Sequence, residues 1–114
     1  MQHFMISKNH QTLIVKATKA TSYFLRLKGL LGKSSLAPQE AIILEPCTSI
    51  HTFFMKFAID AIFLNSENRI IALYSNLKPN RVTKVYWHAK RVVETQSGFI
   101  HSFNLREGDI LCIN

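Results

Sequence analysis

The sequence predicts an α+β fold: a small β-rich domain with a curved or barrel-like, mostly antiparallel sheet and one main helix. Two observations predict this class. Several short runs of β-branched and aromatic residues are separated by turn residues. Only one stretch has its apolar residues at helical spacing. Because 114 residues are the size of one domain, we expect a single domain over residues 1–114.

The stretch Cys47–Leu64 combines large apolar residues with titratable ones more densely than any other. From His51 to Phe63 one set of alternate positions is mostly apolar, and this period of two predicts a strand rather than a helix. A single strand of this length would be unusually long, so we expect a bend near Lys56–Ile59. The apolar face should be largely buried; it comprises Phe53, Met55, Phe57 and Phe63.

Two elements are predicted before residue 35. The β-branched run Gln11–Ala17 is expected to form a first strand. Apolar residues then recur on one helical face, which predicts a helix over Thr21–Leu31 that ends at Gly32. Basic side chains recur every seven residues on the polar side of this helix, at Lys19, Arg26 and Lys33.

The remaining chain predicts a meander of short strands. Ala41–Glu45 should form a strand that Pro46 ends, because proline cannot donate a hydrogen bond to a sheet. Ala61–Leu64 and Arg69–Tyr74 should pair as a hairpin across a turn-rich segment. The pattern leaves the structure of Arg81–His88 open. We predict a strand over Lys90–Gln96 and a helical or irregular turn over Gly98–Leu105. A tight turn should follow over Arg106–Asp109, and a closing strand over Ile110–Ile113.

Hydrophobicity and cysteine content argue against a membrane-spanning, exported or metal-binding protein. The apolar window from residue 41 to 64 is interrupted by four charged or titratable residues, so we expect no membrane-spanning helix. The first residues hold no apolar run typical of a signal peptide, which favours a cytoplasmic protein. We also expect a monomer. Cys47 and Cys112 are far apart and there is no CxxC motif, so we expect two buried thiols, no metal site and no cofactor.

The most informative polar residues are two carboxylates within apolar segments. Asp60 lies between Ile59 and Ala61, and a carboxylate near a core requires a partner; Arg81 is the first candidate, and backbone N–H groups are the alternative. Glu94, within the apolar run of Lys90–Gln96, is the second carboxylate. If Asp60, Glu94 and His51 converge, they form a polar pocket that binds a small ligand or a peptide end without catalysis. The expected ligand-binding residues are His51, Thr52, Asp60, Arg81 and Glu94. A hydrolase that uses the carboxylates and His51 is an alternative.

Charge suggests a second alternative, a nucleic-acid binder. The net charge is +7, and six bases but no acid precede Glu40. Such a surface attracts nucleic acid, although a solvated face that aids solubility is the simpler interpretation. In the nucleic-acid interpretation the contacts come from two basic patches, one with Lys19, Arg26 and Lys33, the other with Lys84, Tyr86, His88 and Lys90.

Nearly the whole chain resembles a family of bacterial and archaeal proteins, domain of unknown function 192. The most specific match is Cys47–Asn65, which is similar to the family pattern Ile-His-Thr-x-Phe-Met-x-x-Pro-Ile-Asp-x-x-Phe, with Ala58 where proline is common. Lys28–Lys33 (KGLLGK) is similar to Arg-Gly-Leu-Met-x-Arg. Shorter matches are Pro79 with Arg81, Val93-Glu94 followed by Gly98, and Gly108-Asp109. The resemblance implies a compact β-rich fold with one main helix, and it implies no particular activity.

Overall fold

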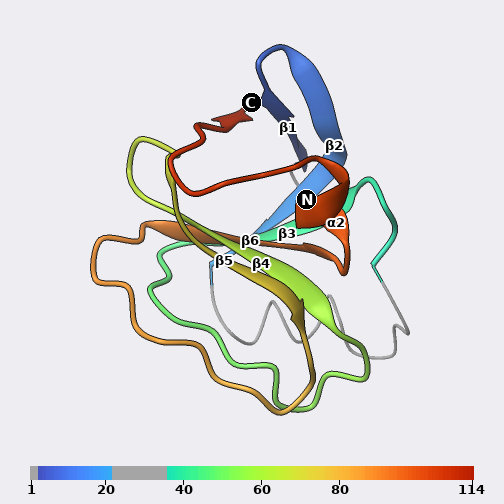
Figure 1. Ribbon diagram of the computed structural model, residues 1–114, viewed down its shortest axis with the longest axis vertical. Coiled ribbons are helices and arrows are strands. Elements are labelled where there is room, and N and C mark those ends of the chain that lie inside the picture. Colours follow the sequence, from blue (N-terminus) through green and yellow to red (C-terminus); the bar gives the residue numbers. More distant parts are fainter. Residues whose placement is uncertain (1–2, 22–35) are drawn as a thin grey trace.

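The computed structural model describes residues 3–21 and 36–114. Seven strands and one short helix lie within these ranges (Figure 1). The strands are β1 (His3–Lys8), β2 (Gln11–Ala20), β3 (Glu40–Leu44), β4 (Ile59–Leu64), β5 (Ile70–Leu77), β6 (Arg91–Gln96) and β7 (Cys112–Ile113), and the helix is α2 (Phe99–Ser102). The helix predicted over Thr21–Leu31 lies outside the described residues, except for Thr21.

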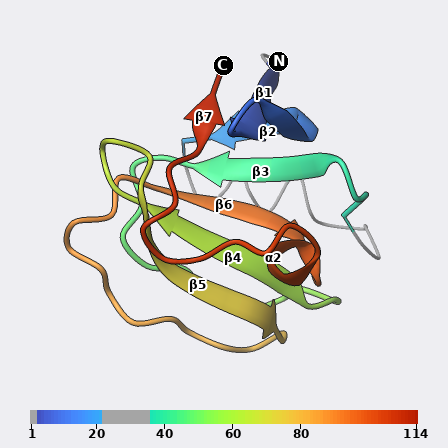
Figure 2. The ribbon, with the colours of Figure 1, turned by 45° about the horizontal axis from the view of Figure 1, so that its top comes forward.

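The strands form one sheet in the order β5-β4-β6-β3-β2-β1-β7. Every neighbouring pair is antiparallel except β2 and β3, which run parallel. The sheet curls into a half-barrel, whose strands follow one another from β7 near the top of Figure 2 to β5 at the bottom. Arg69, just before β5, bridges to Ile110, just before β7, and Ile70 N–H donates to the Asp109 carbonyl at 2.8 Å. The predicted curved, mostly antiparallel sheet is therefore confirmed.

The N-terminal strands differ from the prediction in extent. Strand β2 continues to Ala20, because its parallel pairing with β3 runs as far as Ala20 opposite Leu44. Strand β1 was not predicted at all, since its short sequence has no clear apolar alternation. It is held between β2, with which it forms a hairpin, and β7, which lies at the other end of the sequence.

Core residues cover both faces of the sheet centre. All six residues of β4 are buried. Ile62 and Leu64 pack in one hydrophobic cluster, while Ala61 and Phe63 pack in another. The chain does bend before Ile59, as predicted, but the predicted single apolar face is wrong: β4 is a short central strand buried on both faces, and residues 51–58 before it form a loop rather than a second extended segment.

The later turns follow the sequence prediction. The β4–β5 hairpin is confirmed, and the Asn65 side chain accepts hydrogen bonds from the N–H groups of Glu67 and Arg69 in its turn, at 2.9 and 3.0 Å. Helix α2 begins after Gly98, which has a positive φ of 97° that glycine adopts without strain. The tight turn at 106–109 is closed by Asp109 N–H donating to the Arg106 carbonyl.

None of the helices within residues 3–21 and 36–114 has the length and hydrophobicity needed to cross a membrane.

Candidate functional site

Two loops lie together at the end of the half-barrel away from the termini (Figure 1). They connect β3 to β4 and β5 to β6, and we call them the paired loops (residues 46–58 and 78–90). They run antiparallel: His51 bridges to Val82, and Thr83 N–H and Tyr86 N–H donate to the carbonyls of Ile50 and Thr48, at 3.0 and 2.8 Å. Backbone hydrogen bonds thus hold two irregular segments in one continuous surface.

Thr52 joins the two loops from the inside. It is fully buried, and its hydroxyl donates to the Lys78 carbonyl at 2.6 Å and accepts from Arg81 N–H at 2.9 Å. Its own backbone N–H donates to the Arg81 carbonyl at 2.9 Å. Through these hydrogen bonds Thr52 has a structural role: it fixes the backbone of the loop around Arg81.

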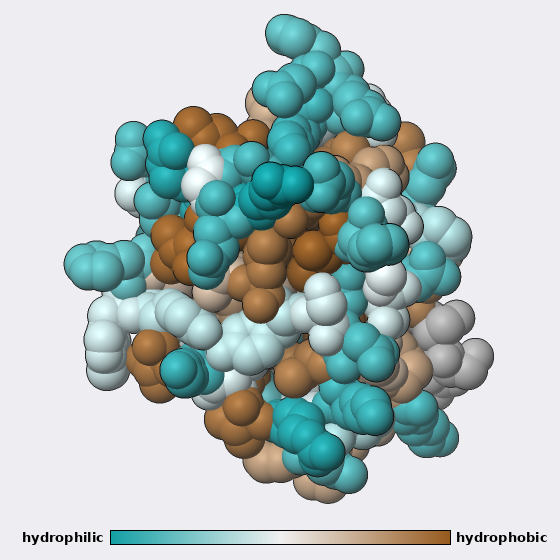
Figure 3. Space-filling view, viewed as in Figure 1, coloured by the Kyte–Doolittle hydropathy of each residue, from teal (hydrophilic) through white to brown (hydrophobic). Residues whose placement is uncertain are grey.

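Large apolar side chains are exposed along the paired loops. Trp87 is 82% exposed and Phe54 is 75% exposed. Phe53, Val82 and Val85 are also exposed. Figure 3 shows hydrophobic groups set among hydrophilic ones over the part of the molecule where these loops lie. Isolated exposed apolar residues are normal, but here five lie on one pair of loops.

Phe53 corrects one prediction. The alternating pattern assigned it to the buried face with Met55, Phe57 and Phe63, but it is 40% exposed. Met55 and Phe63 are buried as expected, and Phe57 is half-buried. The pattern fails at Phe53 because residues 52–55 form a turn, closed by Met55 N–H donating to the Thr52 carbonyl.

The charge on the paired loops is of one sign. No aspartate or glutamate occurs in residues 46–58 or 78–90. The bases in the two loops are all exposed; they are Lys56, Lys78, Arg81, Lys84 and Lys90. The loops therefore combine a positive field with exposed aromatic rings.

Tyr86 does not belong to this exposed surface, contrary to the nucleic-acid prediction. Its hydroxyl lies 2.7 Å from the Tyr74 hydroxyl, and its ring lies 4.8 Å from the ring of Phe63 in the core. The hydrogen bond to Tyr74, together with desolvation, raises the pKa of Tyr86 from 10.0 to about 12. The exposed aromatic residue of this segment is its neighbour Trp87.

Asp60 has backbone partners. It is fully buried on β4, and its two carboxylate oxygens accept hydrogen bonds from Asn76 N–H and Ile100 N–H, each at 2.8 Å. The predicted partner Arg81 is exposed and donates to the Asn80 carbonyl at 3.4 Å. The backbone alternative is therefore the observed one, and Asp60 ties β5 and α2 to β4.

The two buried carboxylates are on opposite faces of the sheet. Asp60 is opposite Thr95 and Ala61 is opposite Glu94 in the β4–β6 pair. Directly opposite residues share a face and successive residues alternate, so Asp60 and Glu94 face apart. Glu94 is fully buried, and its position opposite Ala61 places it on the face of Ala61 and Phe63. The structure does not bring the two carboxylates into one pocket, and the same geometry removes the pair that the hydrolase alternative requires.

The structure does bring His51, Thr52 and Arg81 together on the paired loops. The His51 ring is half-buried, with its centroid 4.7 Å from that of Phe53, and its Nδ1 accepts the Phe53 N–H at 3.3 Å. His51 therefore lies at the edge of the exposed aromatic surface rather than beside Asp60.

The predicted N-terminal basic patch can be followed only in part. Arg26 and Lys33 lie outside the described residues. Lys19 on β2 reaches the carboxylate of Glu45 at 3.5 Å, and Arg91 reaches the same carboxylate at 2.8 Å. Arg91, and to a smaller extent Lys19, hold the pKa of Glu45 below its ordinary value.

The described ranges contain no group of three or more His, Cys, Asp and Glu side chains that could hold a metal ion. The thiols differ from the predicted burial: Cys47 is half-buried and Cys112 is exposed.

Sequence reasoning missed the exposed residues Phe53, Phe54, Val85 and Trp87. The absence of acids between Glu67 and Glu94 was a visible signal for this region. Phe53 was assigned to the core because aromatic residues are usually buried, and the structure of the segment that holds Val85 and Trp87 was left open. A positive φ of 68° at Phe54, which only the structure reveals, marks a residue held in an unfavourable backbone conformation while its ring faces solvent.

Comparison with known proteins gives relatives over nearly the whole chain. The model of domain of unknown function 192, described as an uncharacterized ACR, matches residues 5–113. A UPF0127 protein of Thermococcus sibiricus is 34% identical over 79% of this chain and 60% of its own length. A UPF0127 protein of Pyrococcus furiosus is 41% identical over 55% of this chain and 53% of its own length. The chain thus spans somewhat more than half the length of these curated relatives.

Two crystal structures are similar in fold. A protein of unknown function from Novosphingobium aromaticivorans has a TM-score of 0.80 at 16% identity, over 96% of this chain and 83% of that one. A candidate transcription regulator from Sinorhizobium meliloti has a TM-score of 0.81 at 17% identity, over 96% and 91%. The fold is shared and, with the family match over residues 5–113, the chain belongs to the family of uncharacterized proteins called domain of unknown function 192.

Proposed function

We propose that this protein is a non-catalytic binding protein that recognises single-stranded nucleic acid through the paired loops. One observation carries the proposal: exposed aromatic rings and five exposed bases share two hydrogen-bonded loops that contain no acid. Proteins that bind single strands combine a positive surface for the backbone with aromatic side chains on which bases stack.

The charge of the loops favours a polyanion over a neutral partner. With five bases and no acid in residues 46–58 and 78–90, approach of a phosphate backbone releases counterions at each neutralised phosphate. Lys84 lies on the same loop as Trp87 and Lys90, so phosphate and base contacts can be made side by side.

The aromatic groups favour a single strand over a duplex. In a duplex the bases are stacked on one another, so Trp87 and Phe54 would find no free base to contact. Phe54 would then be a bulky residue held at positive φ, facing solvent, with no function to offset the strain. A stacking role explains both its exposure and its position.

The earlier pocket interpretation has less support. Asp60 and Thr52 use their polar atoms on backbone groups, and Asp60 and Glu94 face opposite sides of the sheet. Of the predicted pocket residues, His51 and Arg81 remain candidates for contacts, as members of the paired loops. The proposal does not rest on the description of the Sinorhizobium protein as a regulator, because that likeness is one of fold.

The test uses the single tryptophan as a reporter. Trp87 fluorescence is measured while a short polyuridine RNA is added at low salt, with binding of a labelled RNA measured in parallel. We expect the RNA to quench Trp87 and to protect it from acrylamide, because a stacked base covers the ring. Log affinity should fall linearly with log salt, by roughly 0.7 for each phosphate contacted.

Variants separate stacking from charge. Trp87→Ala and Phe54→Gly should each weaken binding by about 1–3 kcal/mol, as expected for one lost stacking contact. Lys84→Gln should reduce the salt slope by roughly 0.7. Lys16→Gln and Met5→Ala, at exposed positions on β2 and β1, are the matched controls and should change neither quantity.

Four outcomes contradict the proposal. The absence of RNA binding at low salt would contradict the whole proposal. Equal loss of affinity in Lys16→Gln and Lys84→Gln indicates only a diffuse positive field. Quenching of Trp87 by inorganic polyphosphate as strong as that by RNA indicates an anion site without base stacking, and preference for duplex RNA indicates binding to the phosphate backbone alone.

A further inference from the structure

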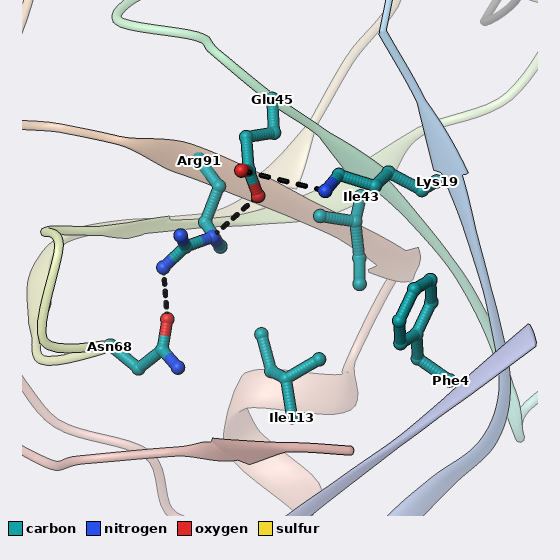
Figure 4. Close-up of a pocket in the computed structure, with 7 residues that line it drawn as sticks. All are labelled: Phe4, Lys19, Ile43, Glu45, Asn68, Arg91 and Ile113. Atoms are coloured by element: carbon teal, nitrogen blue, oxygen red, sulfur yellow. Dashed lines mark hydrogen bonds and ion pairs between the residues drawn. The ribbon is translucent and has the colours of Figure 1, made fainter.

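A cavity of about 200 Å³ lies on the inside of the half-barrel, apart from the paired loops. Figure 4 shows its lining side chains arranged around an open centre. They come from five strands, the residue that follows β3 and the β4–β5 turn: Phe4, Lys19, Ile43, Glu45, Asn68, Arg91 and Ile113. The cavity forms where the curl of the sheet brings the strands β1 and β7 toward the β4–β5 hairpin.

One wall of the cavity is polar and positively charged. Glu45 is held between Arg91 at 2.8 Å and Lys19 at 3.5 Å, so one acid faces two bases (Figure 4). Arg91 Nη1 also donates to the Asn68 side chain and to the Asn65 carbonyl. The charges of this wall sum to one positive, which favours an anionic ligand group.

Two cationic groups of this wall can attract a ligand anion. The hydrogen bonds that Arg91 makes to described residues are donated by Nε and Nη1. The Lys19 side chain is 38% exposed and its contact with Glu45 is the longer of the two ion pairs. A carboxylate accepts well from such a pair, because hydrogen bonds between two charged groups are about twice as strong as neutral ones.

The opposite wall is apolar. Phe4 and Ile113 lie across the cavity from the charged wall in Figure 4, and both pack against the hydrophobic cluster that contains Ile43. A dry cavity of about 150 Å³ is enough for benzene, so about 200 Å³ accommodates a small ring or branched chain together with one polar group.

We propose that this cavity is a second binding site, one that takes a small monocarboxylate with a compact apolar body. The carboxylate lies against Lys19 and Arg91, and the apolar body packs against Phe4, Ile43 and Ile113. This site is independent of nucleic-acid binding by the paired loops.

The experiment is an NMR titration of backbone amides in the millimolar range with benzoate, 4-methylpentanoate, acetate and benzamide. We expect saturable shifts at residues around Lys19, Asn68 and Ile113 with benzoate or 4-methylpentanoate. Acetate, which lacks the apolar body, and benzamide, which lacks the charge, should each bind at least roughly tenfold more weakly.

Variants identify the cavity as the site. Lys19→Gln should weaken binding of the preferred carboxylate at least roughly fivefold, and Ile113→Phe should abolish it by filling the apolar end. Lys16→Gln, an exposed lysine on the same strand but outside the cavity, is the matched control. An unchanged amide spectrum away from the substituted residue establishes that each variant is folded.

The proposal is overturned if neither apolar carboxylate gives saturable shifts, if benzamide binds as well as benzoate, or if Lys19→Gln and Lys16→Gln weaken binding equally. Titration of the Lys19→Gln variant with RNA distinguishes the two sites. If this variant loses carboxylate binding but keeps its affinity for RNA, the cavity and the paired loops bind their ligands independently.

Discussion

The hydroxyl groups of Tyr74 and Tyr86 lie 2.7 Å apart and connect strand β5 to the loop that carries Trp87. Lys84 N–H also donates to the Tyr74 hydroxyl, at 3.2 Å. Both tyrosine rings pack against Phe63, with centroid separations of 5.8 Å for Tyr74 and 4.8 Å for Tyr86. The exposed loop is thus anchored to the core by a hydrogen-bonded aromatic pair.

This pair predicts a loss of stability at alkaline pH. The pKa of Tyr86 rises from 10.0 to about 12 in the folded protein, so its contribution is fully present below pH 10 and is lost as the pH approaches about 12. Tyr74→Phe removes the main cause of the raised pKa. We expect the unfolding free energy of this variant to fall less steeply over this range than that of the wild type, measured by urea denaturation. Equal slopes for the two proteins would contradict this account.

Asp60→Ala should destabilise the protein strongly. The substitution leaves Asn76 N–H and Ile100 N–H without their buried acceptor, and each unsatisfied group costs about 1–3 kcal/mol. Asp60→Asn retains one acceptor oxygen and should lose less. Urea denaturation measures both variants, and a substitution to alanine that costs no more than Asp60→Asn would mean that these hydrogen bonds do not stabilise the fold.

Glu45 predicts a loss of stability in acid. Arg91, first through its hydrogen bond, and Lys19 hold the pKa of Glu45 below 4.5. The stability from this carboxylate is therefore present above pH 4.5 and is lost as the pH falls through the lower pKa of the folded state. Glu45→Gln should flatten the acid limb of the stability profile, whereas Glu67→Gln, at an exposed position, should leave it unchanged.

The two phenylalanines Phe63 and Phe53 should differ sharply in their effect on stability. Phe63 is fully buried, so Phe63→Ala should cost roughly 3–5 kcal/mol. Phe53 is 40% exposed, and Phe53→Ala should cost well below that, about 1 kcal/mol or less. Thermal or urea unfolding of the two variants makes the comparison; similar losses would mean that Phe53 belongs to the core.

The sequence by itself determined the class of fold, the hairpin between Ala61 and Tyr74, and the position of the later strands. Local signals sufficed there, because turn residues and β-branched runs mark where a chain reverses and where it extends. The motif Cys47–Asn65 also carried enough information to indicate the family. The acid-free stretch between Glu67 and Glu94 was visible in the same way, since charge is read directly from composition.

Only the tertiary structure decided how the candidate residues face. Alternation reveals which residues of a strand share a face, but strand pairing decides what lies opposite each of them. The β4–β6 register places Glu94 opposite Ala61 and so separates it from Asp60. Likewise, the turn at residues 52–55 exposes Phe53, and the hydrogen bond to Tyr74 draws Tyr86 inward and leaves Trp87 in solvent. The strand register and the bond between Tyr74 and Tyr86 depend on contacts between residues distant in sequence, which no local pattern encodes.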